Sequence, residues 1–210
     1  MPEATSYVSV DVLAVRFDRS DRLIRLGIHR RPADPYAGEL ALPGVLLLRG
    51  ERLAAAGARA LAKLGVPVAS RLAEGQLVTF DEPNRDPRGP TLSIALWAVV
   101  DDLGGGVDGA AWVDLDDVPP LAFDHDRIVA DCRPRLADLL WRDLAFSRAL
   151  TGEVFTAADA LAIATSLTGA QPDRGNLNRT LAGLPGLRRS EERRLSSSGV
   201  GRPGVVWTWA

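Results

Sequence analysis

The sequence predicts an α+β protein in two parts: a mixed-sheet α/β/α sandwich, followed by a winged helix-turn-helix unit. Strand-like and helical runs follow each other irregularly along residues 7–140, which does not fit βαβ repeats. Residues 143–210 instead give helix, turn, helix and hairpin, in that order. The charge balance changes at the same place, with 16 basic and 21 acidic residues in 1–140 but 9 basic and 6 acidic residues in 141–210. We therefore expect domains at 1–142 and 143–210.

The elements of the first domain follow from the spacing of apolar residues. Apolar and β-branched runs separated by polar turns predict strands. Apolar residues three and four positions apart predict helices, and Gly65 and Pro67 end the first helix. The expected strands are 7–17, 23–28, 40–48, 76–80, 91–100 and 110–114, and the expected helices are 53–64 and 124–140.

The second domain begins near Trp141 and carries two helix start signals. Thr156 and Asp159 form a capping box for a helix that runs to about residue 167. Asp173 can cap a second helix over about 174–184. A short strand at 187–190, a basic loop at 191–204 and a strand at 205–209 complete a hairpin. A basic unit with this order of elements favours nucleic acid as a partner.

The composition excludes some classes of protein. The single cysteine, Cys132, rules out a disulfide framework and favours a reducing compartment. The first residues lack the basic start and apolar run of a secretory signal peptide. Since the chain has no uncharged apolar stretch of membrane-spanning length, we expect a cytoplasmic protein without a membrane partner.

One motif carries recognisable chemistry. Leu42-Pro43-Gly44 precedes Gly50-Glu51, and a predicted helix then leads to Gly65-Val66. This pattern, over residues 44–66, resembles the signature of the Nudix hydrolases in a degenerate form. Glu51, Arg59 and Leu61 match the signature, whereas Ala60, Lys63 and Leu64 stand where it has glutamates.

The missing glutamates change the expected function. The resemblance implies that the glutamates of the signature would bind divalent cations, as they do in Nudix enzymes, because such cations need hard oxygen ligands. Alanine and leucine supply no ligand, and Lys63 places a positive charge there. We therefore expect no catalytic residues, no metal site, no cofactor and no hydrolysis. Two alternatives stay open: a divergent hydrolase of a nucleoside diphosphate derivative with ligands elsewhere, and an amphipathic helix unrelated to Nudix proteins.

The wider sequence resembles the Nudix-related transcriptional regulators of NAD metabolism, the NrtR-type proteins. The resemblance rests on three further segments and covers nearly the whole chain: His29 to Gly44, Asp86-Pro87-Arg88-Gly89, and Pro119 to His125. It implies a Nudix-like domain that senses ADP-ribose or a related nucleotide, and a winged helix that binds operator DNA as a homodimer. The controlled genes would belong to NAD or sugar-nucleotide metabolism.

Four residues are candidates for ligand contact: Arg30, Arg31, Asp86 and Arg88. The planar guanidinium of arginine suits a diphosphate. For each of them a surface ion pair is the alternative. For His125 we expect a hydrogen bond that ties the loop before the second helix, rather than catalysis.

The candidates for DNA contact fall into two groups. Arginine can read guanine and asparagine can read adenine in the major groove. The second helix offers Arg174, Asn176, Asn178 and Arg179. In the hairpin loop, Arg193, Arg194 and Arg202 would contact phosphates or the minor groove. A solvated helix and a solvated loop are the alternatives.

Overall fold

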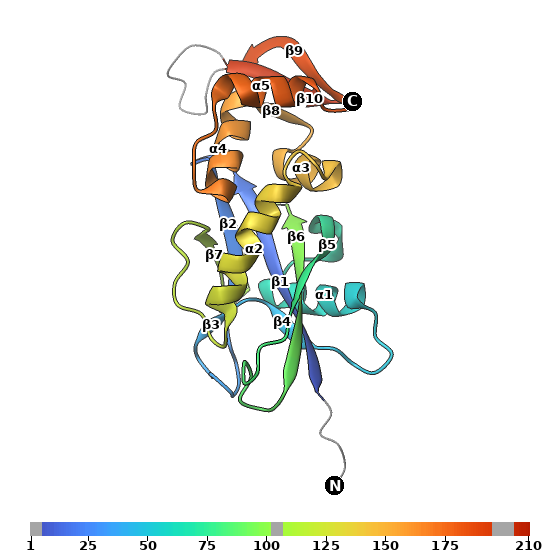
Figure 1. Cartoon of the computed structure of the whole chain (residues 1–210), viewed down its shortest axis with the longest axis vertical. Coiled ribbons are helices and arrows are strands. Elements are labelled where there is room, and N and C mark those ends of the chain that lie inside the picture. The colour runs from blue at the N-terminus through green and yellow to red at the C-terminus, as the bar shows by residue number, and fades with distance from the viewer. Residues whose placement is uncertain (1–5, 102–106, 195–203) are drawn as a thin grey trace.

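The computed structural model describes residues 6–101, 107–194 and 204–210, without the side chains of 191–194. One large sheet occupies the lower half of the view in Figure 1, and a small sheet lies at the opposite end of the long axis. Helices α2, α3 and α4 lie between or alongside the two sheets. The two predicted parts are therefore stacked end to end.

The large sheet has seven strands and is mixed. The order of its main path is β3-β2-β1-β6-β5, while β4 pairs with β1 and β7 pairs with β2. The long strands β1 and β6 are parallel, and the other pairs are antiparallel. The strands are β1 (Tyr7–Asp18), β2 (Leu23–Arg30), β3 (Leu40–Ala41), β4 (Gly44–Leu46), β5 (Arg71–Phe80), β6 (Thr91–Val100) and β7 (Ala110–Asp114).

Alternate residues of β1 and β6 face opposite sides of this sheet, and each side is covered by helices. Helix α1 (Leu53–Leu61), continued by a 3-10 turn at Ala62–Leu64, covers one side. Helices α2 (His125–Leu139), α3 (Leu144–Thr151) and α4 (Ala157–Thr168) contribute to the core on the other side. The predicted α/β/α sandwich is confirmed.

The C-terminal part has the order of elements of a winged helix. Helix α3 is followed by β8 (Val154–Thr156), α4, α5 (Arg174–Ala182) and the hairpin of β9 (Leu187–Arg194) and β10 (Gly204–Trp209). The three strands form a sheet in the order β8-β10-β9. Both predicted caps are present, since Thr156 and Asp159 form a capping box and Asp173 accepts a hydrogen bond from the Asn176 amide.

The core does not stop at the predicted boundary. The cluster on the α2 side of the large sheet includes Phe146 and Leu150 of α3 and Ile163 and Leu167 of α4. The Phe146 ring packs edge-on against Trp97 of β6, with 5.0 Å between ring centroids. The division at residue 142 therefore stays a prediction about folding units, because apolar packing is continuous across it.

Polar contacts cross the same boundary. In the turn between β1 and β2, Arg22 Nε lies 3.1 Å from a carboxylate oxygen of Asp159, at the start of α4. On α2, Arg133 donates hydrogen bonds to the carbonyls of Ser166 and Leu167 near the end of α4. The start and the end of α4 are thus both attached to the sheet domain.

The observed elements differ from the expected ones in several places. Helix α3 and strand β8 lie where no element was expected, and β5 begins at Arg71 and not at residue 76. The expected strand over 40–48 is two short strands, β3 and β4, separated by Leu42-Pro43. Strand β9 continues to Arg194, so the backbone of Arg193 and Arg194 belongs to the hairpin strand and not to a loop.

Two features of the described residues concern membrane spans and cysteine chemistry. Their helices are all too short or too polar to cross a bilayer. Cys132 is buried, and burial raises the pKa of its thiol to about 12, which leaves no reactive thiolate near neutral pH.

Candidate functional site

A cavity of about 280 Å³ opens where β1 begins to pair with β4. Six segments line it: β1, the loop after β2, β4 with the residues just before it, the 3-10 turn after α1, the loop between β5 and β6, and the start of α2. Its charged lining residues are Asp11, Arg31, Asp34, Lys63, Arg85, Asp86 and Arg88. Four cations around one cavity suit an anionic ligand.

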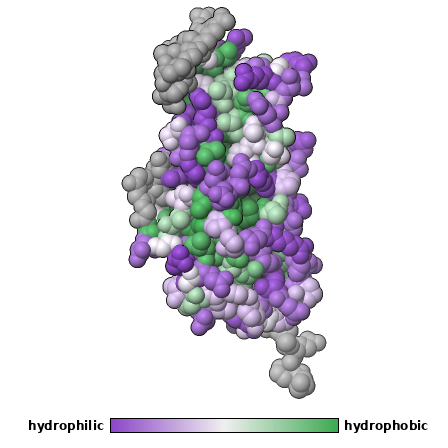
Figure 2. All heavy atoms as spheres, turned by 90° about the vertical axis from the view of Figure 1, so that its left-hand side faces the viewer, coloured by the Kyte–Doolittle hydropathy of each residue, from purple (hydrophilic) through white to green (hydrophobic). Residues whose placement is uncertain are grey.

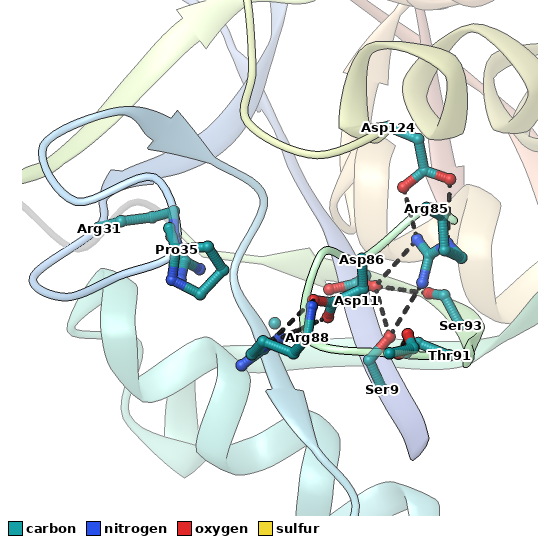
Figure 3. A network of polar contacts seen from close by, with 12 residues as sticks. Ser9, Asp11, Arg31, Pro35, Arg85, Asp86, Arg88, Thr91, Ser93 and Asp124 are labelled. Carbon is teal, nitrogen blue, oxygen red and sulfur yellow. Dashed lines mark hydrogen bonds and ion pairs between the residues drawn. The ribbon is translucent and has the colours of Figure 1, made fainter. Parts of the chain in front are cut away.

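A buried ion network forms the floor of the cavity (Figure 3). The side chain of Arg85 is only 4% exposed. It donates to both carboxylate oxygens of Asp124, at 3.0 and 2.6 Å, and also lies 3.8 Å from Asp11. The Ser9 and Ser93 hydroxyls donate to Asp11. Because each buried charge has partners, the network can fix the loop after β5 against α2.

Asp11 also explains the glycine at the start of β4. Gly44 is its register partner in the neighbouring strand. A Cβ added at Gly44 would lie 1.9 Å from Asp11 Oδ1, far inside van der Waals contact. The Leu42-Pro43-Gly44 motif therefore lets the backbone approach this carboxylate closely.

His125, at the first turn of α2, holds the same backbone from the other side. Its Nδ1 accepts a hydrogen bond of 3.0 Å from the Leu42 amide, so a neutral ring carries its proton on Nε2. Nε2 lies 3.6 Å from Asp11 Oδ1. Burial lowers the pKa of His125 despite the nearby carboxylates of Asp11 and Asp124. The side chain thus makes a structural hydrogen bond, as expected, but it ties the start of α2 to the backbone between β3 and β4.

Two arginines stand at the cavity wall beside one aromatic ring. The Arg31 guanidinium carbon lies 4.6 Å from the centre of the Phe123 ring, and that of Arg88 lies 5.7 Å from it. Arg31 Nε donates to the Pro35 carbonyl at 2.7 Å, and Arg88 pairs with Asp86 at 2.6 Å. Figure 3 shows Arg31 coming from the loop after β2 and Arg88 from the loop after β5.

The charges of these two arginines are not equally neutralised. Hydrogen bonding to Asp86 raises the pKa of Arg88. Burial opposes ionisation of Asp86, but its hydrogen bonds with Arg88 outweigh burial and lower its pKa. For Arg31, burial and then repulsion from Arg88 lower the pKa. An anion placed beside Arg31 would remove part of that penalty.

Lys63 completes the cationic lining from the α1 side. It lies in the 3-10 turn after α1, is partly buried, and its ammonium donates a hydrogen bond to the Gly44 carbonyl. Burial and then repulsion from Arg31 lower its pKa. Within the described part of the chain, no ion pair joins Lys63 or Arg31 to a carboxylate.

The residues at this site do not fit a magnesium ion. Ala60 and Leu64 are at most 1% exposed and pack in the apolar cluster under α1. Both Glu51 oxygens are occupied, at 2.7 Å each by Arg59 and at 2.9 Å by the Leu48 amide, and these bonds lower the Glu51 pKa to about 2. Among the described residues, no group of three or more His, Cys, Asp and Glu side chains could hold a metal.

The structure separates the four predicted ligand residues. Arg31, Asp86 and Arg88 line the cavity together. Arg30 is exposed, donates to the Gly38 carbonyl and lies outside the lining, so its contact with a ligand stays a prediction that the cavity does not support. Successive residues of a strand point to opposite sides, and this rule could have separated Arg30 from Arg31.

Sequence reasoning missed five other charged or aromatic residues of the site. They are Asp11, Asp34, Lys63, Arg85 and Phe123. Arg85 directly precedes the singled-out Asp86, and Phe123 belongs to a singled-out segment, so both had a sequence signal. Lys63 had been considered only as an obstacle to metal.

The predicted DNA-contact residues of α5 are all exposed. Leu177 and Leu181, one turn apart, bury one side of the helix against the hairpin. Arg174, Asn176, Asn178 and Arg179 are exposed around the rest of the helix; Arg174 lies toward α4 and Asn178 toward the hairpin. Arg179 donates to the Asn176 side chain, and Arg174 also borders a shallow groove between α4 and the turn before β2.

The hairpin is described only in part. Arg193 and Arg194 pair through their backbones with Val205 and Gly204 at the end of β9. Their side chains, and the whole of Arg202, lie outside the described residues. Arg188 and Arg189, nearer the start of β9, are exposed. Exposed basic and amide side chains therefore lie on both α5 and the adjoining strand.

Comparison with solved structures supports the whole-chain arrangement. The chain superimposes on NrtR of Shewanella oneidensis with a TM-score of 0.76 and 24% identity, covering 97% of this chain and 94% of that one. A second structure of that protein holds a 27mer DNA. The Nudix domain of the same protein, solved with ADP ribose, matches 65% of this chain at 27% identity and a TM-score of 0.55. The predicted resemblance to NrtR-type proteins is confirmed as a Nudix fold followed by a C-terminal unit.

A curated relative matches part of the sequence. It is the ADP-ribose pyrophosphatase of Methanocaldococcus jannaschii, 34% identical over 110 residues. The match takes in 49% of this chain and 62% of that protein, which is less than two thirds of the relative's length. No protein-family model matches the chain.

Proposed function

We propose that this protein is a ligand-responsive regulator of transcription, which binds operator DNA and senses ADP-ribose or a related nucleotide in its Nudix-like pocket. One observation carries the proposal: a cationic pocket and an exposed basic helix belong to two parts of the chain that share one apolar core. Its genes would be those of NAD or sugar-nucleotide metabolism, and its place of action the cytoplasm. NrtR of S. oneidensis, with the same fold, has been solved with ADP ribose and with DNA.

The pocket supports a nucleotide diphosphate as the ligand. Arg31 and Arg88 offer planar groups of donors close to each other, and Lys63 adds a third cation. The cavity volume of about 280 Å³ suits part of a nucleotide rather than a macromolecule. Phe123 supplies an apolar surface beside the arginines.

Helix α2 supports a connection from the pocket to DNA. It begins at His125, next to Asp124 of the buried network, and Arg133 near its middle bonds to the end of α4. Helix α4 packs in turn on α5 and the hairpin. Ligand binding that favours one position of the loop after β5 would therefore bias the position of the DNA-facing helix.

The DNA partner would be a two-fold symmetric operator bound by a homodimer. A single winged helix contacts few base pairs, and pairing two copies doubles the readout. Figure 2 shows apolar side chains gathered in the middle of one side face of the molecule, which a second copy could cover.

A gel-shift experiment tests the regulator directly. Purified full-length chain is titrated against DNA from upstream of its own gene, with and without ADP-ribose, and against random DNA of equal length. We expect a specific complex whose midpoint moves when ADP-ribose is added. Equal binding to both DNAs, or a midpoint that ADP-ribose does not move, would contradict the proposal.

A second candidate function is a divergent Nudix hydrolase, favoured by the match to the M. jannaschii ADP-ribose pyrophosphatase. The occupied Glu51 and the buried Ala60 and Leu64 argue against it. With magnesium or manganese, we expect no hydrolysis of ADP-ribose, NADH or sugar nucleotides above a no-protein control. Turnover abolished by a chelator would establish the enzyme instead.

A further inference from the structure

Lys63, in the 3-10 turn after α1, lines the pocket where a phosphorylated ligand would bind. The Lys63 ammonium donates to the Gly44 carbonyl at the edge of the cavity. A backbone carbonyl is also an oxygen ligand of the kind that divalent cations take. The Lys63 ammonium thus lies where a divalent cation would contact the Gly44 carbonyl. The nearby Ala60 and Leu64 side chains are buried and supply no metal ligand.

The same lysine has charge available for an anion. Its described hydrogen bond is to a neutral carbonyl, and an ammonium has three donors. Arg31, which lowers the pKa of Lys63 by repulsion, likewise bonds to carbonyls of its own loop. Two cations therefore face one cavity, and their hydrogen bonds go to neutral oxygens. Asp11 attracts both of them, and Asp34 and Asp86 also attract Arg31, without forming an ion pair with either.

We propose that the pocket binds the diphosphate of its ligand without a divalent cation, with Lys63 and Arg31 supplying the two positive charges. This inference rests on the proposed function, because it concerns the same site and the same class of ligand. A magnesium ion beside the ammonium would be repelled, and magnesium bound to the free ligand would neutralise the charge that the pocket recognises. Added magnesium should therefore leave the affinity unchanged or weaken it.

Calorimetric titration of the full-length protein tests this. The probes are ADP-ribose and inorganic pyrophosphate, each titrated with a chelator present and again with excess magnesium. We expect a dissociation constant in chelator that is equal to or lower than that in magnesium. Binding that requires magnesium would overturn the inference while leaving nucleotide sensing intact.

Variants then test the lysine itself. Lys63→Met should weaken ADP-ribose binding by about 10- to 100-fold, the usual effect of removing a charged hydrogen bond. Lys63→Arg, which keeps the charge, should retain most of the affinity. Arg135→Met, an exposed cation on α2, is the matched control and should bind as the parent does. Unchanged binding by a folded Lys63→Met protein would contradict the role of Lys63.

The two probes separate the failure of this inference from that of the proposed function. If pyrophosphate binds in chelator through Lys63 but ADP-ribose does not, the metal-free anion site stands and the proposed effector is wrong. If neither probe binds under either condition, both proposals fail. The pH dependence gives a further readout, since anion affinity should fall at alkaline pH as Lys63 loses its charge, and Lys63→Arg should remove that fall.

Discussion

The pocket and the exposed basic surface of α5 and β9 hold the same residue, arginine, in opposite ways. In the pocket, Arg85 and Arg88 each pair with a carboxylate at 2.6 Å, and Arg31 is fixed by the Pro35 carbonyl. On the α5 side, Arg174 and Arg189 are exposed to solvent. Fixed groups favour one ligand shape because little order is lost on binding, whereas exposed ones give attraction over a distance. We therefore expect the pocket to favour one ligand shape, and the basic surface to attract an anionic partner from a distance.

The largest expected effect comes from breaking the buried network. Arg85→Met leaves Asp11 and Asp124 without their cation, and such a loss costs about 3–5 kcal/mol of unfolding free energy. Arg88→Met, on a side chain that is 42% exposed, should cost less than about 1 kcal/mol. Urea unfolding followed by tryptophan fluorescence measures both. Equal losses of unfolding free energy in the two variants would show that the buried network of Arg85, Asp11 and Asp124 does not stabilise the pocket.

A smaller effect is expected from the first residue of α5. Arg174→Ala should cost about 1–3 kcal/mol on the operator and much less on random DNA, because a base contact is lost. Titration of the parent and the variant against both DNAs gives the specificity ratio, and Arg135→Ala serves as the control. Since Arg174 also borders the groove beside α4, an unchanged ratio would assign it to that groove instead.

The stability of the sheet domain should depend on pH through His29. Burial, followed by repulsion from Lys63, lowers the pKa of His29 in β2 from 6.5 to about 4. Between these values the unfolded chain binds a proton that the folded chain does not, so the unfolding free energy falls as the pH drops, by up to about 1.4 kcal/mol per pH unit. His29→Asn should reduce this slope in urea unfolding at several pH values. Parallel pH profiles for parent and variant would remove His29 as a cause.

The DNA side should respond to salt. Arg193→Ala should weaken binding to operator and random DNA by similar factors. Loss of one phosphate contact lowers the slope of log affinity against log salt by about 0.9. Arg202→Ala should behave alike. The slopes come from titrations at three or more salt concentrations. A change in specificity without a change in slope would assign these arginines to base reading.

Where local pattern and tertiary packing agreed, the sequence predicted the fold well. Strand β7 was predicted at its observed bounds, and both caps of the second part follow from Thr156 and Asp173. Helix α3 was missed because it has only eight residues, too few for its period to stand out. What stabilises it is the contact of Phe146 with Trp97, which lies about fifty positions away in the sequence.

The site was less predictable for a physical reason. Arg31, Asp86 and Arg88 were found through the resemblance, whereas the importance of Arg85 depends on burial and on Asp124, 39 positions away. The direction of the Lys63 side chain depends on how α1 meets β4. Such properties belong to the packing of distant segments, and no local pattern encodes them.

The shared core also bears on how the two parts of the chain could be exchanged between proteins. A DNA reader that joins its sensor by a flexible tether can be exchanged as a cassette. Here a cut at residue 142 would strip Phe146, Leu150 and Ile163 from the sheet and expose apolar surface on both fragments. A working chimera would have to carry α3 and α4 together with the sheet face on which they pack, so the useful unit of exchange is that interface and not the C-terminal sequence.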